Sequence, residues 1–327
     1  MTDRTATFEL ERHLTDDDLV ATLRADVTAG LTATPKALPP KYFYDARGSE
    51  LFEEITRLPE YYPTRRERAV LAAHAQDVAR LTGADTVVEL GSGSSSKTRL
   101  VLDALSRAGT LATYVPVDVS ESALRGAAEA LLADYPGLQV RPVVADLERH
   151  VHLLPRGGRR LALFLGGTIG NLLPAERAAF LAAVHEWLAP GDHLLLGTDL
   201  VKDPARLVAA YDDAAGVTAE FNHNVLNVLR SALGARVDVD AFAHRAVWDA
   251  DAEWIEMRLQ ALGDTVIEVP QLGVRAEFAA GDELRTEVSA KFRREGVEAE
   301  LDAAGFDLAG WWTDPDGDFA VSLARRT

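Results

Sequence analysis

A short glycine turn is the first segment of the chain whose residue types indicate chemistry. Residues 86–90 read Thr-Val-Val-Glu-Leu, a strand-like run, and Gly91-Ser92-Gly93 follows them directly. Glycines at these two positions allow a sharp turn and let a ligand approach the backbone amides closely. Because glycine turns also follow strands that bind nothing, this turn alone indicates only a candidate cofactor site.

Three kinds of cofactor compete for this turn. A dinucleotide prefers a third glycine where the chain has Ser96. A nucleoside triphosphate prefers a loop that Gly91 to Thr98 matches except at that same serine, where the loop must wrap tightly around phosphates. S-Adenosylmethionine has no phosphate, and Lys97 can hold its carboxylate. The turn favours S-adenosylmethionine and leaves an ATPase or kinase open as an alternative.

Acidic residues stand at the ends of the next two strand-like runs. One run ends in Asp118, and the next ends in Asp146, which Leu147 follows. Asp118 can accept hydrogen bonds from both hydroxyls of a ribose. Asp146 can accept from the adenine amine while Leu147 packs on the ring. Each aspartate alone would also suit a turn or a helix cap, but together they favour adenosine without phosphates.

A fourth strand-like run leads to an amide side chain at Asn171. Ligands of open parallel sheets bind beyond the carboxyl ends of the strands, so Asn171 is expected to face the methyl group that is transferred. Its amide can donate to a carboxylate and accept from an amine. The alternative is that Asn171 only caps the helix that begins near Pro174.

The elements that must position these residues alternate along the middle of the chain. After a helix over residues 66–81, short apolar runs are each followed by a helical segment as far as Asp199. Such runs are typical of parallel strands covered by helices on both faces. With right-handed crossovers, they predict an α/β fold with a doubly wound, mainly parallel, Rossmann-like sheet.

A second, smaller α+β unit is predicted within this fold. A helical stretch over residues 211–233 precedes three alternating segments, and the first, residues 252–262, is a candidate strand to pair with the other two. Residues 306–326 indicate a hairpin that returns to the sheet edge. We expect a cofactor-binding domain from residues 66–201 and 292–327, and a substrate-binding domain from residues 13–65 and 202–291.

Composition excludes several kinds of partner and site. The 327 residues carry 34 basic and 51 acidic side chains, a formal charge of −17, and no cysteine. So acidic a surface repels nucleic acid, and a chain without thiols has no thiolate metal site or cysteine nucleophile. His150 and His152 form the only close histidine pair and suit an exposed loop better than a metal. No metal is expected.

Targeting signals are also missing from the sequence. The first fourteen residues include acids where a signal peptide needs an apolar core, and no apolar run is long enough for a membrane span. No coiled coil is evident. We therefore expect a cytoplasmic monomer with no membrane partner.

Eight stretches of the chain match motifs of one known family: PPKYFYDA (39–46), ITRLPEYYPTR (55–65), ELGSG (89–93), FLGGTIGNL (164–172), GTDLVKD (197–203), YDDAAGVTA (211–219), FNHNVL (221–226) and TEVSAKF (286–292). On these motifs the chain resembles, over nearly its whole length, the histidine-specific S-adenosylmethionine-dependent methyltransferases. The resemblance implies a class I methyltransferase fold. It also implies three successive methyl transfers to the α-amine of L-histidine, giving hercynine for ergothioneine biosynthesis.

The resemblance also assigns roles to single residues. Those that it places at the cofactor are Gly91, Lys97, Asp118, Asp146 and Leu147. Those that it places at the substrate are Asn171 and Tyr211 for the carboxylate, Tyr61, Glu287 and Ser289 for the imidazole, Tyr44 near the amine, and Met257 in the side-chain pocket. The chain departs from the family at Leu147, where an aromatic residue is expected, and at Gly167, where serine is commoner.

The implied roles agree with the chemistry of a neutral imidazole, which has one donor and one acceptor nitrogen. Glu287 can accept from the N–H, and Ser289 or Tyr61 can donate to the other nitrogen. Glu287 and Ser289 are two residues apart in a strand-like stretch, so they share one face. Tyr44 or a water can take the proton of the amine. Outside the motif, Glu287 would suit a solvated strand, and the tyrosines would suit ordinary packing.

Two further functions remain open on the sequence. One is a methyltransferase for another amino acid such as tryptophan, against which Glu287 argues. The other is a non-catalytic sensor of S-adenosylmethionine, which only the acidic surface supports.

Overall fold

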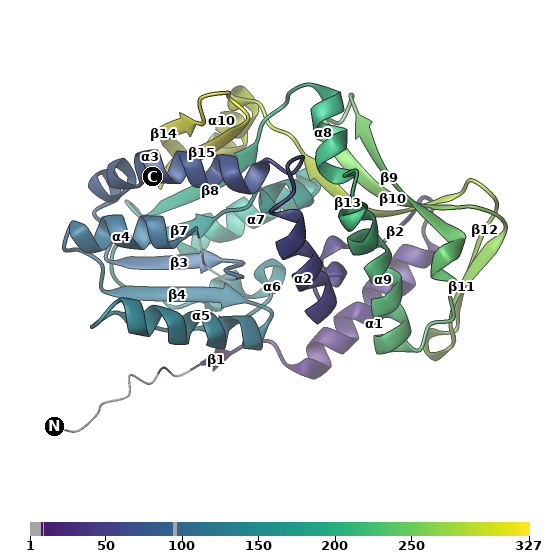
Figure 1. The fold of residues 1–327 in the computed structure, drawn as a ribbon. Coiled ribbons are helices and arrows are strands. Elements are labelled where there is room, and N and C mark those ends of the chain that lie inside the picture. Colours follow the sequence, from purple (N-terminus) through teal and green to yellow (C-terminus); the bar gives the residue numbers. More distant parts are fainter. Residues whose placement is uncertain (1–7, 9, 94–96) are drawn as a thin grey trace.

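The computed structural model describes residues 8, 10–93 and 97–327, so Ser96 of the glycine turn lies outside the described residues. Two sheets, each with its own helices, lie side by side in this part of the chain (Figure 1). The larger sheet occupies the left of the view and the smaller one the right.

The larger sheet of the described chain has nine strands in the order β1-β6-β4-β3-β7-β8-β15-β14, with β5 beside β4. They are parallel except β15 and β14, which return antiparallel along β8. The strands are β1 (Glu11–Arg12), β3 (Thr86–Leu90), β4 (Thr113–Asp118), β5 (Gln139–Val140), β6 (Val143–Val144), β7 (Arg160–Phe164), β8 (His193–Asp199), β14 (Phe306–Thr313) and β15 (Phe319–Arg326). The predicted doubly wound, mainly parallel sheet and C-terminal hairpin are confirmed.

Helices cover both faces of this sheet. Because successive strand residues point to opposite faces, Val87 packs in the cluster of α3, α4 and α5, whereas Val88 packs in the cluster of α7 and α10. The elements around the sheet are α3 (Pro63–Thr82), α4 (Arg99–Arg107), α5 (Glu121–Asp134), α6 (Leu147–His150), η2 (Val151–Leu153), η3 (Thr168–Asn171), α7 (Pro174–Trp187) and α10 (Arg294–Ala303). None of the described helices is long and apolar enough to cross a membrane.

The smaller sheet has the order β2-β13-β10-β9, and a separate hairpin pairs β11 with β12. These strands are β2 (Lys36–Ala37), β9 (Phe242–Asp249), β10 (Trp254–Ala261), β11 (Thr265–Val269), β12 (Val274–Phe278) and β13 (Glu283–Ala290). Around them lie α1 (Asp16–Thr32), η1 (Pro40–Phe43), α2 (Ala46–Ile55), α8 (Pro204–Tyr211), α9 (Val217–Leu233), η4 (Val239–Ala241) and η5 (Pro270–Leu272).

The strand pairing proposed for residues 252–262 is wrong. That segment forms β10, which pairs with β9 and β13 and not with β11 or β12. Alternating strands do not specify their partners by pattern alone. Here β10 is central because Ile255 and Leu259 are fully buried in the core of the smaller unit.

The single helix expected over residues 211–233 is two helices. The chain leaves the helical path between Tyr211, the last residue of α8, and Val217, the first of α9. Gly216 takes a φ of 77°, and the Asp213 carboxylate accepts from the N–H groups of Val217 and Thr218 at 3.1 and 2.7 Å. Asp213 thus caps α9, and the break leaves Tyr211 at a helix end facing β13.

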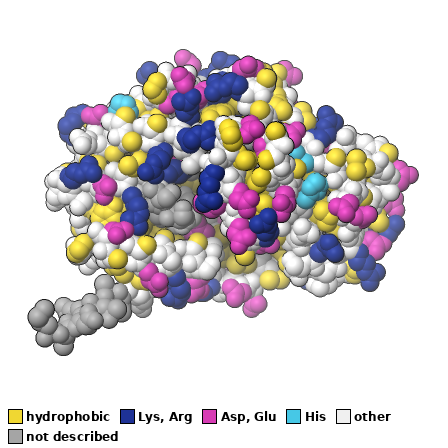
Figure 2. Space-filling view, in the orientation of Figure 1, with side chains coloured by type: hydrophobic (Ala, Val, Ile, Leu, Met, Phe, Trp, Pro, Cys, Tyr) yellow, Lys and Arg dark blue, Asp and Glu magenta, His cyan; other side chains and the backbone are white. Residues whose placement is uncertain are grey.

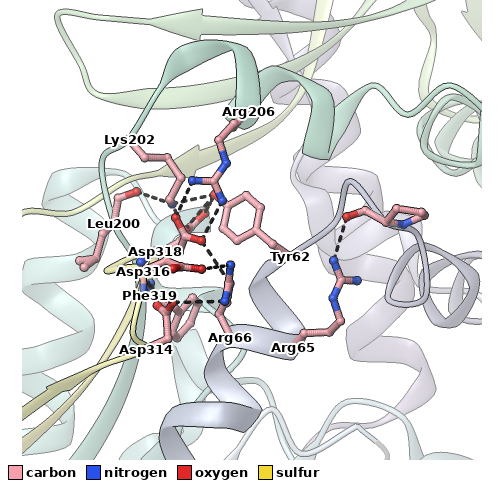
Figure 3. A network of polar contacts seen from close by, with 12 residues as sticks. Tyr62, Arg65, Arg66, Leu200, Lys202, Arg206, Asp314, Asp316, Asp318 and Phe319 are labelled. Carbon is pink, nitrogen blue, oxygen red and sulfur yellow. Dashed lines mark hydrogen bonds and ion pairs between the residues drawn. The ribbon is translucent and has the colours of Figure 1, made fainter.

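A charged network joins the smaller unit to the larger sheet (Figure 3). Arg206 of α8 donates to both oxygens of Asp318 at 2.9 and 2.8 Å, and Arg66 of α3 lies 3.1 Å from the same carboxylate. Burial alone would raise the pKa of Asp318, but the two arginines hold that pKa below its ordinary value. The network therefore fastens α8 to the hairpin of β14 and β15.

The same network contains the one group of three or more possible metal ligands among the described residues. Asp314, Asp316 and Asp318 come close together between β14 and β15. Arg66 is paired with all three carboxylates, so arginine already balances much of their charge.

We expect Arg206→Ala to lower the free energy of unfolding by about 1–2 kcal/mol, because buried Asp318 loses a bidentate partner while Arg66 remains. Urea denaturation measures this. Arg230→Ala, which removes an exposed arginine from α9, is the control and should change stability by less than about 0.5 kcal/mol. Equal effects of the two changes would contradict a role for Arg206 in fastening α8.

Candidate functional site

The glycine turn lies where the order of the larger sheet reverses. From β3 the sheet extends to β4 on one side and to β7 on the other. Gly91 and Gly93 take positive φ angles of 73° and 48°, which glycine adopts without strain. The N–H groups of Gly91 and Ser92 donate to the Val117 carbonyl at 2.9 and 3.0 Å. The turn therefore lies at the point where open α/β sheets bind ligands.

Asp118, predicted to bind ribose, lies directly beside the turn. One of its oxygens accepts from the Gly93 N–H and the other from the Ser120 N–H, both at 2.9 Å. A carboxylate has about four lone-pair sites, so this half-buried group can still accept from two hydroxyls. The structure thus brings the predicted acid to the predicted turn.

Asp146 and Leu147 follow the neighbouring strand β6. Asp146 caps α6 by accepting from the Glu148 N–H at 2.9 Å. The helix-cap alternative is therefore correct, but this hydrogen bond uses only one lone pair of the carboxylate. Its own N–H donates to Nδ1 of His150 at 3.2 Å. Leu147 faces the turn, since a Cβ built on Gly91 would lie 3.9 Å from its Cδ1. Leu147 thus offers an apolar surface next to the glycine turn.

Lys97 pairs with a buried carboxylate that the sequence does not reveal. Its ammonium contacts Glu67 of α3, whose side chain is fully buried. Glu67 also accepts from the Gly166 N–H at 2.7 Å, and a Cβ on Gly197 would lie only 2.1 Å from it. In the sequence, Glu67 lies among other charged residues of the helix, so no local pattern predicts that its side chain is buried. Lys97 keeps further N–H groups for a cofactor carboxylate.

Asn171 connects the larger sheet to β13. Its amide nitrogen donates to Glu287 and to the carbonyl of Val288, both at 2.8 Å, so it does not cap α7. These bonds use both amide protons and leave the oxygen Oδ1 for a ligand. Oδ1 accepts, which suits an amine directly. A substrate carboxylate fits Asn171 only if the nitrogen exchanges one of its present partners.

Glu287 is poised between its two protonation states. Its surroundings remove the carboxyl from water, which raises its pKa to about 7, although the Asn171 amide and the Lys291 ammonium each lower it. Near neutral pH the ionised form is accessible and seeks a donor. An N–H of a ligand would stabilise that form.

Ser289 and Tyr211 form a hydroxyl pair on the same face of β13 as Glu287. Their oxygens lie 2.7 Å apart, and Lys291 donates to both, at 2.8 Å to Ser289 and 2.9 Å to Tyr211. All three side chains are buried. Sequence reasoning missed Lys291, because lysines are almost never buried and nothing in the sequence names its partners.

Two tyrosines and two phenylalanines form an aromatic wall beside these polar groups. Tyr61 is buried, with its ring edge-on to Tyr211 and Phe52 at centroid distances of 6.2 Å each. Tyr44 packs edge-on against Phe52 and Phe221 at 5.6 and 5.5 Å, yet is 49% exposed. Tyr44 thus packs against other aromatic rings while part of its side chain reaches solvent.

The pKa of the Tyr44 hydroxyl depends on charges from both halves of the candidate site. Desolvation by surrounding protein raises its pKa above the ordinary value, and the charges of Glu287 and Asp118 raise it further. The tyrosine hydroxyl is therefore within electrostatic range of both the carboxylate beside the glycine turn and the carboxylate on β13. Met257 stands opposite Glu287 in the pairing of β10 with β13 and is buried.

The parallel sheet with a glycine turn at its reversal, and with acids at the next strand ends, is the fold of a class I S-adenosylmethionine-dependent methyltransferase. The family described as "Histidine-specific methyltransferase, SAM-dependent" matches residues 23–326, and the chain belongs to that family. The expectation drawn from the sequence motifs is thus confirmed.

Relatives of nearly equal length agree with this assignment. The chain is 55% identical over 320 residues to "Histidine N-alpha-methyltransferase" of Mycolicibacterium smegmatis, covering 98% of this chain and 100% of that protein. It is 55% identical over 314 residues to the protein of the same name in Mycobacterium tuberculosis, covering 96% and 98%. It is 31% identical to "Ergothioneine biosynthesis protein 1" of Neurospora crassa, covering 85% of this chain and 32% of that protein.

We expect Asp118→Ala to weaken S-adenosylmethionine binding about 10- to 100-fold, because two ribose hydroxyls lose a charged acceptor. Titration calorimetry with the cofactor measures this. Asp302→Ala, which removes an exposed acid from α10, should leave the affinity unchanged. An unaltered affinity in the Asp118 variant would remove this residue from the cofactor site.

Glu287 should make the ligand-free protein less stable as pH rises. A carboxyl with a folded pKa of about 7 and an ordinary value of 4.5 favours folding fully below pH 4.5, and this contribution is lost as pH rises through 7. The free energy of unfolding of Glu287→Gln, measured relative to wild type, should therefore rise by about 1–3 kcal/mol between pH 5 and pH 8. Urea denaturation at the two pH values tests this, and a constant difference would contradict it.

Proposed function

We propose that this protein transfers methyl groups from S-adenosylmethionine to the α-amine of L-histidine, three times in succession, to give hercynine. The observation that carries the proposal is one face of β13. There Glu287 offers an acceptor and the pair of Ser289 with Tyr211 offers hydroxyls. An imidazole needs one group of each kind, and amino acids with apolar side chains would leave these buried groups unpaired.

The residues around the turn fit the cofactor by their chemistry. Asp118 supplies acceptors for the ribose, Leu147 an apolar surface for the adenine, and Asp146 an acceptor for the adenine amine. Lys97 supplies donors for the carboxylate of the cofactor. When bound, S-adenosylmethionine supplies a methyl group already activated on a sulfonium sulfur. The protein then has mainly to align the amine with that methyl group and to exclude water.

We assign the substrate amine to Asn171 and Tyr44. Oδ1 of Asn171 can accept an amine N–H and so direct the nitrogen lone pair. When the imidazole N–H takes its place as a donor to Glu287, one N–H of Asn171 can turn to the substrate carboxylate, while Tyr211 keeps its contact with Ser289. Because its pKa is raised, Tyr44 stays a neutral phenol. Its oxygen can accept a proton from the amine while its own O–H proton passes to water, which leaves the phenol neutral.

The two sheets divide these tasks between them. We assign cofactor binding to residues 66–201 with 292–327, and substrate binding to residues 13–65 with 202–291. We also propose that the protein is a cytoplasmic monomer with no nucleic-acid or membrane partner. In its favour, acidic and basic side chains are interspersed over the face seen in Figure 2, and the net charge of −17 opposes nucleic-acid binding.

Incubation with S-adenosylmethionine and each of the twenty amino acids in turn, followed by mass analysis, tests the function. We expect trimethylated L-histidine as the main product and at least about 100-fold slower transfer to tryptophan. Reactions with S-adenosylhomocysteine in place of the cofactor are the control.

Other outcomes would overturn separate parts of the proposal. A product that stops at one methyl group would refute successive transfer. Equal rates with tryptophan would refute histidine specificity. Cofactor binding without transfer to any amino acid would support the sensor.

A further inference from the structure

A buried lysine holds the hydroxyl pair that faces the imidazole site. The ammonium of Lys291 donates to Ser289 at 2.8 Å and to Tyr211 at 2.9 Å, and it lies 3.0 Å from Asp199 at the end of β8. An ammonium has three N–H groups and no acceptor. All three protons therefore have partners within the protein.

Lys291 stays charged in this position. Burial alone would lower its pKa, but Asp199 and the hydrogen bond to Tyr211 raise that pKa above the ordinary value. The other charged groups that face this cluster are Lys202, which binds Asp199 at 2.6 Å, and Glu287 on β13. Lys291 is thus a permanent donor to both hydroxyls.

The hydrogen bonds leave the hydroxyl pair one proton to offer. Tyr211 and Ser289 have two hydroxyl protons, and one of these lies in the 2.7 Å contact between their oxygens. A phenol is the more acidic hydroxyl, so Tyr211 donates and Ser289 accepts. The serine oxygen then receives two hydrogen bonds, from Lys291 and from Tyr211, and both of its lone pairs are filled. Its own O–H remains, and it can only donate.

We propose that Lys291 is a positioning residue that makes Ser289 an obligate hydrogen-bond donor toward the substrate ring. This inference rests on the proposed function and extends it. Since all three N–H groups of Lys291 bind protein atoms, the lysine acts on the substrate only through Ser289. Glu287 and Ser289 then present opposite polarities on one face of β13: the first accepts and the second donates. A ring must bring both an N–H and an acceptor nitrogen to satisfy them.

This arrangement discriminates against rings that Glu287 alone would admit. An indole has an N–H for Glu287 but no acceptor nitrogen for Ser289, and an imidazolium has two N–H groups and no acceptor. Either ring would leave the serine proton unpaired in a buried site, which costs binding. Selection for the neutral imidazole thus depends on Lys291, which acts through Ser289.

Two histidine analogues isolate the acceptor nitrogen. The 2-pyrrolyl and 3-pyrrolyl analogues of histidine each keep one ring N–H and replace the other nitrogen by C–H. With the wild type, we expect kcat/KM for L-histidine to exceed that for the better analogue about 10- to 100-fold. In Lys291→Met, Ser289 regains a free lone pair, so this ratio should fall about tenfold. KM for histidine should rise more than kcat falls, because the reacting amine is untouched.

Lys202→Met is the matched control. It removes the other ammonium from Asp199 without touching the hydroxyl pair, so it should keep the wild-type ratio of histidine to analogue. If Lys291→Met does not fold, Ser289→Ala replaces it, and the ratio should fall there as well.

Three results would overturn the proposal: a wild-type ratio near one, an unchanged ratio in Lys291→Met, or, should that variant not fold, an unchanged ratio in Ser289→Ala. Each of these can occur while the wild type methylates histidine normally. Absence of histidine methylation by the wild type would instead refute the proposed function itself.

Discussion

The candidate site exists because one buried carboxylate holds β13 against the end of the parallel sheet. Asp199 binds two ammonium groups, Lys202 at 2.6 Å and Lys291 at 3.0 Å, and accepts from the Tyr62 hydroxyl at 2.9 Å. Its backbone carbonyl also accepts from the Phe292 N–H at 2.8 Å. Since an unpaired buried charge is very costly, the ammonium of Lys291 is stable in this position only beside Asp199. The pairing of Lys291 with Asp199 sets the position of the proposed substrate-facing residues of β13 relative to the glycine turn.

The two halves of the site use different kinds of interaction. At the cofactor turn, backbone amides order the carboxylate of Asp118, which is only half buried. At β13, side chains order one another: Asn171 fixes Glu287, and the buried Lys291 fixes Ser289 and Tyr211, which are also buried. In the function that we propose, selection of a polar ring depends on this second arrangement, because a buried hydroxyl left without a partner costs binding.

Local pattern predicted the elements of the larger sheet well and those of the smaller unit less well. The strand before the turn, the turn itself and Asp118 lie within or directly after short segments, and alternation of apolar runs with helices indicates a parallel sheet. In the smaller unit, the break at Asp213 to Gly216 and the central place of β10 were missed. Several alternating strands of similar composition allow more than one pairing, and burial in the complete core selects among them.

The sequence by itself determined the fold class, the glycine turn and the residue types at the strand ends, because these depend on local periodicity and on backbone freedom at single positions. The family motifs added which side chains are expected to meet the substrate. Only the tertiary structure decided that Glu67 and Lys291 are buried, that Asn171 donates to Glu287, and that burial raises the pKa of Glu287 to about 7. The reason is physical: desolvation and hydrogen-bond partners come from segments remote in the chain, and no local pattern records them.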